Sequence, residues 1–144
     1  MKNIIKYINK IIIFQLRWGL IQKKKILIVD DNPDVRYSVK YGLEKNNDQI
    51  EVIEIKDGMK CISYLQHNIS PDLILLDIMM PVMDGWSVAS KIKSNPEWEN
   101  IPIFFLTAKN DSYSKSFGKI LSDRYISKPF DLSCLNQLIN DLFR

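Results

Sequence analysis

From residue 25 onward, short apolar runs alternate with segments of helical periodicity, and this alternation constrains the fold more than any other feature of the 144-residue chain. Such alternation is typical of a parallel β-sheet with helices on both faces. The expected strands are residues 26–29, 50–55, 72–77, 101–108 and 123–127. We therefore predict an α/β fold: a doubly wound, five-stranded parallel sheet with five helices.

The segments between the strands carry helix signals. After the first strand, Asp31 or Asn32 can cap a helix that has Pro33 in its first turn. Further helices are expected over residues 59–67, from Gly85 to the loop at 94–100, and over residues 131–143. The serine-rich segment 109–122 is a weak helix former, so we expect a mobile helix there.

Residues 1–24 form a basic amphipathic extension in front of a domain over residues 25–144. Residues 1–29 contain seven Lys or Arg and no acid, and the rest of the chain is acidic on balance. Helical spacing places basic and apolar residues on opposite sides. The uncharged run 11–16 is far shorter than the ~20 residues of a membrane span. A membrane surface, a partner protein, or translation upstream of the native start all remain possible explanations.

Length and cysteine content limit the class of protein. A chain of 144 residues is about the size of one domain with a full core. Cys61 and Cys134 are the only cysteines and lie too far apart in sequence for a disulfide framework or a C-x-x-C motif. A reducing, cytoplasmic setting is the expectation.

Polar residues end four of the five predicted strands. Asp30 and Asp31 follow the first strand, Asp77 ends the third, Thr107 lies near the end of the fourth, and Lys128 follows the fifth. Right-handed crossovers place the carboxyl ends of all parallel strands along one edge, where ligands bind. We expect these five side chains to converge on one small site.

The chemistry of that set points to a metal and a phosphoryl group. Clustered carboxylates repel one another unless a cation neutralises them, and Mg²⁺ binds through one or two carboxylates. A carboxylate beside such a metal can act as a nucleophile toward phosphorus. Lys128 would shield the incoming phosphoryl oxygens, and Thr107 could donate a hydrogen bond to them.

Four pieces of the sequence resemble the receiver domain of two-component response regulators, of the stand-alone single-domain type with a flavodoxin-like fold. They are "ILIVDDNPDVR", "PDLILLDIMMPVMDG", "IPIFFLTA" and "YISKPF", in family order over about residues 25–143. The resemblance implies that Asp77 accepts a phosphoryl group from a sensor histidine kinase or a histidine phosphotransfer protein. It also implies a cis Lys128–Pro129 bond.

The same resemblance assigns further roles. Mg²⁺ would be held by Asp31, Asp77 and the backbone carbonyl of Met79, with Asp30 acting through water. Thr107 and Tyr125 would form the switch that reports phosphorylation to an unknown downstream protein. Because the residues up to 144 leave no room for a further domain after the receiver, we expect neither a DNA-binding domain nor an enzymatic output.

Two departures from the family pattern concern the loops. Met79 and Lys109 stand where the family tunes the lifetime of the acyl phosphate. Because methionine cannot orient an attacking water, we predict slow self-dephosphorylation. The stretch "LSDRY" lacks the small residues usual before the acid, which leaves the path of that loop open.

Alternatives exist for the residues and for the function. Asp31 could be a helix cap, Tyr125 a packing residue, and Met79, Met80 and Met83 are interpreted as packing; His67 is interpreted as a surface residue. An aspartate-nucleophile phosphatase would have an acid two residues after Asp77, and a flavin mononucleotide protein would have a Ser/Thr/Gly-rich loop after the first strand. A pseudo-receiver would lack an acid or the lysine, and none is missing.

Overall fold

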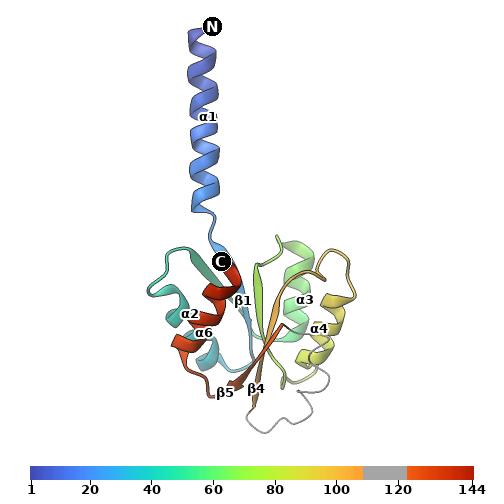
Figure 1. The fold of residues 1–144 in the computed structure, drawn as a ribbon. Coiled ribbons are helices and arrows are strands. Elements are labelled where there is room, and N and C mark those ends of the chain that lie inside the picture. The colour runs from blue at the N-terminus through green and yellow to red at the C-terminus, as the bar shows by residue number, and fades with distance from the viewer. Residues whose placement is uncertain (109–122) are drawn as a thin grey trace.

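One parallel sheet with the strand order β2-β1-β3-β4-β5 organises the domain (Figure 1). The computed structural model describes residues 1–108 and 123–144, apart from the side chains of 18–21. The strands are β1 (Lys24–Val29), β2 (Ile50–Ile55), β3 (Leu73–Asp77), β4 (Ile103–Ala108) and β5 (Arg124–Lys128). The central strand β3 is buried along its whole length, whereas the edge strand β2 alternates between buried and more exposed positions. The predicted α/β sheet is confirmed.

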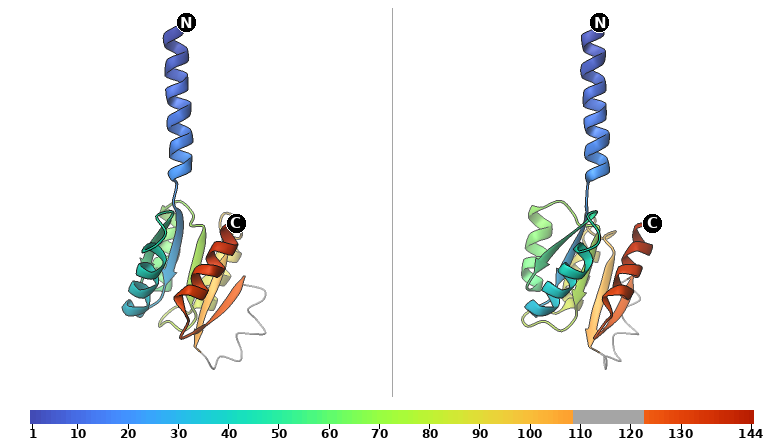
Figure 2. Two further views of the ribbon diagram at one scale, coloured as in Figure 1. Left: turned by 60° about the vertical axis from the view of Figure 1, so that its left-hand side comes forward. Right: turned by 90° about the vertical axis from the view of Figure 1, so that its left-hand side faces the viewer.

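Helices cover both faces of this sheet (Figure 2). Helices α2 (Pro33–Glu44) and α6 (Leu132–Phe143) pack on one face, and α3 (Gly58–His67) and α4 (Gly85–Lys93) pack on the other. Successive strand residues point to opposite faces, so Leu27 joins the core under α3 and α4 while Ile26 joins the core under α2 and α6. The helix expected over 109–122 lies outside the described residues.

Each of these four helices begins at a side-chain cap. Asn32 accepts a hydrogen bond from the backbone N–H of Asp34, at 2.9 Å, and Pro33 occupies the first helical position. Asp57, Asp84 and Asp131 cap α3, α4 and α6 in the same way. Of the two caps considered for α2, the structure uses Asn32, and this leaves the Asp31 side chain exposed beside the end of the sheet.

The first strand begins two residues earlier than predicted. Lys24 and Lys25 pair with Ile50 and Glu51 of β2, so both belong to the sheet, although Lys24 lies within the predicted basic extension. Helix α1 (Lys2–Ile21) precedes this strand and extends away from the rest of the molecule (Figure 1). Among the described helices, none combines the length and apolarity that a membrane crossing requires.

Candidate functional site

Asp30 lies at the carboxyl end of β1 and is completely buried. Its backbone N–H donates to the carbonyl of Ile55 at 3.1 Å, which extends the β1–β2 pairing by one bond. Its carboxylate accepts the backbone N–H of Asn32, at 2.9 Å, and the guanidinium of Arg36 donates to its backbone carbonyl at 2.8 Å. The turn into α2 therefore holds the Asp30 carboxylate in one orientation.

Asp77 is the last residue of β3, and it is 5% exposed. The start of α4 packs directly on this strand end, because Gly85 donates its N–H to the carbonyl of Ile78 at 2.8 Å. A Cβ atom on residue 85 would lie 2.3 Å from the backbone oxygen of Asp77, so only glycine fits at this position. The glycine that follows the "VMD" segment in sequence thus allows the loop to close tightly beside the acid.

Lys128 joins the two buried acids. Its ammonium group lies 2.5 Å from Oδ2 of Asp30 and 3.2 Å from Oδ1 of Asp77. It is the last residue of β5, and the peptide bond that follows it, Lys128–Pro129, is cis as expected. One ammonium group therefore serves two carboxylates that lie almost fully out of water.

The electrostatics of the cluster follow from this imbalance. Burial, and then the charge of Asp30, raise the pKa of Asp77 to about 6, although Lys128 acts in the opposite direction. Burial alone would lower the pKa of Lys128, but its hydrogen bond to Asp30 and the charges of Asp77 and Asp30 outweigh burial and raise it. The site carries more negative charge than its lysine neutralises.

The acidic cluster has the composition of a magnesium site. Asp30, Asp31 and Asp77 each offer a carboxylate oxygen, and these atoms all lie within 4.8 Å of one another. Hard oxygen donors at such separations suit Mg²⁺, and an added cation would offset both the burial and the repulsion by Asp30 that raise the pKa of Asp77. The residues present therefore fit this ion.

The loop between β3 and α4 corrects one prediction. Met80 is buried and Met83 packs against the core, as interpreted, but the Met79 side chain is 69% exposed and does not serve as packing. The backbone turns sharply three residues after Met79: Val82 has φ 67°, and the N–H of Met83 donates to the carbonyl of Pro81 at 2.8 Å. A β-branched residue rarely adopts such a φ, which no sequence periodicity could indicate.

Thr107 and Tyr125 lie on neighbouring strands near the acids. Thr107 is 5% exposed, and its hydroxyl donates to the backbone carbonyl of Ala108 at 2.9 Å. The Tyr125 ring packs against Phe105, with 5.5 Å between ring centroids, and against Trp86, with 6.4 Å. The packing interpretation of Tyr125 is thus compatible with the structure, and its role as a switch residue stays a prediction.

Two other residues complete the comparison with the sequence. Arg36, which the sequence analysis did not single out, fixes the Asp30 carbonyl and also lies 3.6 Å from Glu54. The only signal for it is its position one turn after the cap of α2. His67 is exposed, and its ring lies 2.8 Å from the carbonyl of Ser63, which confirms the surface interpretation.

The model of the response regulator receiver domain family matches residues 26–140. Response regulator Rre1 of Synechocystis sp. is 35% identical over 118 residues, covering 81% of this chain and 50% of Rre1. Protein PilH of Pseudomonas aeruginosa is 33% identical over 117 residues, covering 81% of this chain and 94% of PilH. The chain thus spans half the length of Rre1 and nearly all of PilH.

A solved structure agrees with these sequence relatives. The crystal structure of the phosphorylated cyanobacterial phytochrome response regulator RcpA has 31% sequence identity and a TM-score of 0.72, over 83% of this chain and 91% of RcpA. The acids at the carboxyl edge of the sheet, the lysine on β5 and the family match over residues 26–140 agree with one another. This chain belongs to the response regulator receiver domain family of two-component signalling systems.

Proposed function

We propose that this protein is a phosphorelay switch in which Asp77 accepts a phosphoryl group from a phosphohistidine of a sensor histidine kinase or a histidine phosphotransfer protein. The observation that carries the proposal is the site itself: three carboxylates within 4.8 Å of one another, with one lysine between Asp30 and Asp77. The similarity to RcpA, which was solved in a phosphorylated form, supports it.

The transfer step uses the ionised form of Asp77. With a pKa of about 6, this carboxyl is mostly ionised at pH 7 and can attack phosphorus. A carboxylate oxygen forms the new O–P bond, the P–N bond of the phosphohistidine breaks, and the imidazole leaves with that electron pair. Lys128, at 3.2 Å from Asp77, is placed to neutralise the phosphoryl oxygens during transfer.

The proposed magnesium site consists of Asp31, Asp77 and the Met79 backbone carbonyl, with Asp30 acting through water. When bound, Mg²⁺ would neutralise charge on the transferring phosphoryl group. Asp31 is exposed and Asn32 caps α2 in its place, so the Asp31 carboxylate is available for this role. Asp30 already accepts hydrogen bonds from Asn32 and Lys128, which suits an indirect contact.

The proposed switch begins at Thr107. A phosphoryl group on Asp77 would add about −1.5 to −2 charge and three acceptor oxygens. The Thr107 hydroxyl would exchange its bond to the Ala108 carbonyl for one of these oxygens. The Tyr125 ring packs on Phe105, which lies two residues before Thr107 in β4. Tyr125 would then change position and alter the surface that an unknown downstream protein contacts.

We also propose how the chain is divided and where it acts. Residues 25–144 would form the receiver domain and residues 1–24 an extension, with signalling through protein contacts as output and no catalytic output of its own. The proposal places the protein in the cytoplasm, the reducing setting that the free thiols of Cys61 and Cys134 suit.

Phosphorylation by a small donor tests the central claim. Wild type, Asp77→Asn and the control Asp72→Asn are incubated with acetyl phosphate and Mg²⁺ and examined by intact mass spectrometry. We expect a gain of about 80 Da, one phosphoryl group, in wild type and in the control, and none in Asp77→Asn. No adduct in wild type, or an adduct that survives in Asp77→Asn, would overturn the proposal.

The lifetime of the phosphorylated form is a separate part of the proposal. Met79 offers no amide or carboxylate to orient water, and its exposed side chain leaves that position without a polar group. Slow self-dephosphorylation stays a prediction, and a half-life of only seconds without a phosphatase would contradict it.

A further inference from the structure

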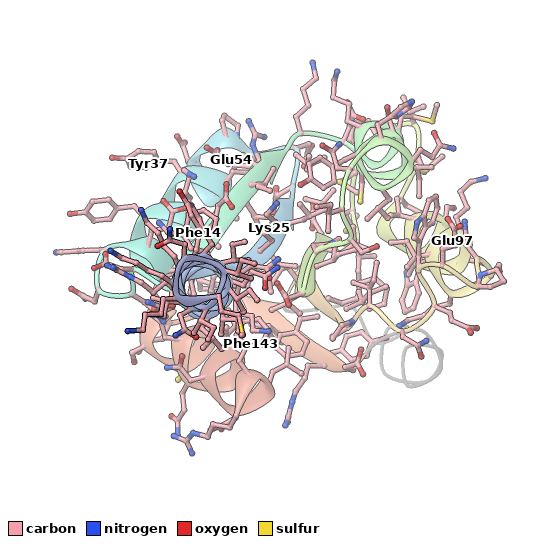
Figure 3. All side chains as sticks on the ribbon, turned by 90° about the horizontal axis from the view of Figure 1, so that it is seen from above. Phe14, Lys25, Tyr37, Glu54, Glu97 and Phe143 are labelled. Carbon is pink, nitrogen blue, oxygen red and sulfur yellow. The ribbon has the colours of Figure 1, made fainter. Side chains whose placement is uncertain are left out.

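Helix α1 presents an apolar face that none of the described residues covers. Figure 3, which looks down the helix axis, shows its side chains radiating around it, with Phe14 among them. The aliphatic residues of this face are each between 46% and 62% exposed: Ile4, Ile5, Ile8, Ile11, Ile12 and Leu16. Apolar surface of this extent on one side of a helix indicates a site of contact.

All charged residues on the opposite side of α1 are basic. Lys2, Lys6, Lys10 and Arg17 form a stripe along the helix, interrupted by Ile13. Residues 1–29 contain no Asp or Glu, so nothing on the helix neutralises the stripe. A surface that complements α1 must therefore be apolar in its interior and negative at its boundary.

The width of the apolar face distinguishes between a membrane surface and a second copy of α1 as the partner of this helix. At 100° per residue, the six aliphatic positions span about 140° of the helix circumference, wider than the narrow seam through which two helices pair in a coiled coil. Tyr7 and Phe14, at 70% and 64% exposed, widen it further toward the polar side. A second copy of α1 would also bring only Lys and Arg to the contact, with no acids to pair with them.

The connection of α1 to the domain is compatible with contact at a surface. Lys24, at the amino end of β1, pairs with Asp72 at 3.1 Å and lies over the Phe143 ring at 5.4 Å. Asp30 follows the carboxyl end of the same strand, so α1 and the acidic site lie at opposite ends of the sheet (Figures 1 and 2). A surface that holds α1 leaves the acidic site open to a partner.

We propose that α1 lies in the plane of an anionic membrane surface. Its aliphatic face enters the boundary between headgroups and acyl chains, and the lysine and arginine stripe reaches the lipid phosphates. Each basic residue near such a surface strengthens binding by about fivefold. This inference does not depend on the function proposed for Asp77, since it uses different residues at the other end of the sheet.

Vesicle flotation with the full chain tests the proposal. The vesicles contain phosphatidylcholine alone or with phosphatidylglycerol as about a third of the lipid. We expect binding to the anionic vesicles, weak binding to the neutral ones, and release at high salt, which screens the attraction. Substituting Lys2, Lys6 and Lys10 together with Gln should lower the partition coefficient on the order of 100-fold.

Two further variants separate the contribution of the α1 charges from that of its apolar surface and from that of the total charge of the protein. The control carries the same loss of three charges on the receiver surface, at Lys45, Lys60 and Lys91, all exposed and outside α1, and should bind like wild type. Ile8→Ser with Ile12→Ser keeps the charges and removes apolar surface, and should also bind weakly. Because tertiary contacts contribute little to α1, anionic vesicles should increase the helical circular dichroism of wild type.

The outcomes that would overturn the proposal are distinct. Equal binding to neutral and anionic vesicles, or equal loss in the α1 variant and its charge-matched control, would exclude recognition of anionic lipid by α1. No vesicle binding at low salt, together with a dimer in sedimentation that Ile8→Ser with Ile12→Ser abolishes, would assign the apolar face to self-association. Thermal unfolding of each variant shows that the receiver domain is intact.

Discussion

Aspartates lie at both the amino and the carboxyl ends of the strands, and their hydrogen-bond partners differ between the two ends. At the amino ends, Asp72 precedes β3 and accepts the backbone N–H of Lys25 at 2.8 Å, and Asp123 precedes β5 and accepts that of Ile103 at 2.9 Å. At the carboxyl ends, Asp30 and Asp77 share the ammonium group of Lys128. Asp72 and Asp123 thus complete the hydrogen bonding of the sheet, whereas Asp30 and Asp77 bring two negative charges close to one ammonium group.

The end of the strand at which a carboxylate lies therefore decides whether it completes backbone hydrogen bonding or forms part of a charged site. At an amino end, a strand offers N–H groups that a neighbouring carboxylate can satisfy, so hydrogen bonds from the backbone stabilise the charge of the acid. At a carboxyl end, a strand offers carbonyls, so an acid there depends on side chains, on ions or on an N–H group of the following turn, as Asp30 does with Asn32. The same residue type therefore acquires a raised pKa at Asp77 and a backbone partner at Asp72.

The largest expected effect comes from removing the shared cation. Lys128→Gln should slow phosphorylation by acetyl phosphate about 10²- to 10³-fold, because the variant loses the positive charge beside the attacked phosphoryl group. Lys24→Gln, which removes the lysine paired with Asp72 at the other edge, is the control and should phosphorylate at the wild-type rate. Initial rates by intact mass measure both; similar rates in the two variants would refute this role for Lys128.

Metal affinity should show the next largest contrast. Asp31→Asn removes an exposed carboxylate from the cluster of three and should weaken Mg²⁺ binding about 100-fold, measured by calorimetric titration. Asp72→Asn removes an acid that already has backbone and lysine partners and should leave the affinity unchanged. An equal loss in the two variants would mean that only net charge attracts the ion.

The sequence predicted the sheet and the gathering of the acids because both depend on regular features. Alternating apolar runs define parallel strands, and parallel strands place their carboxyl ends at one edge, so Asp30, Asp77 and Lys128 had to approach one another. The structure adds the distances, which show that one lysine contacts both buried acids. Chemical roles for these residues remain proposals.

The features that escaped sequence analysis lie where the backbone is irregular. The exposure of Met79 depends on a loop that includes Val82 at φ 67°, and no periodicity encodes such a loop. The close approach of Gly85 to the Asp77 carbonyl and the bond from Arg36 to the Asp30 carbonyl depend on how α4 and α2 pack against the ends of the strands that precede them. Helix α1 was predicted from its amphipathic pattern, but the pattern does not name the surface it contacts.

Substituting an acid should change the free energy of unfolding with opposite sign at the carboxyl and amino ends of the strands, and the substitution of Asp77 should give the larger change. Its folded pKa of about 6 lies above the ordinary value of 3.8, so the folded state holds the proton more tightly. Without Mg²⁺, stability should therefore fall as the pH rises through the window from about 4 to 6. Asp77→Asn removes this penalty and should be about 2–3 kcal/mol more stable than wild type at pH 7, a difference that shrinks to about half a kcal/mol near pH 4.

Urea unfolding of both proteins across this pH range measures the effect on the free energy of unfolding. Saturating Mg²⁺ should reduce the difference, because the ion stabilises only the protein that binds it. A difference that does not change with pH would show that the substitution acts through packing and not through the charge of Asp77.

At the amino edge, loss of an acid should destabilise the fold by a smaller amount. Asp72→Ala removes the acceptor for the Lys25 N–H and should lower the free energy of unfolding by about 1 kcal/mol. Asp72→Asn keeps an oxygen acceptor and loses only the charge toward Lys24, in a pair that is 49% and 35% exposed, so it should change stability by no more than a few tenths of a kcal/mol. If Asn destabilised the fold as much as Ala, the pair with Lys24 would be the stabilising interaction, and the amino-edge acids would depend on side-chain cations just as the carboxyl-edge acids do.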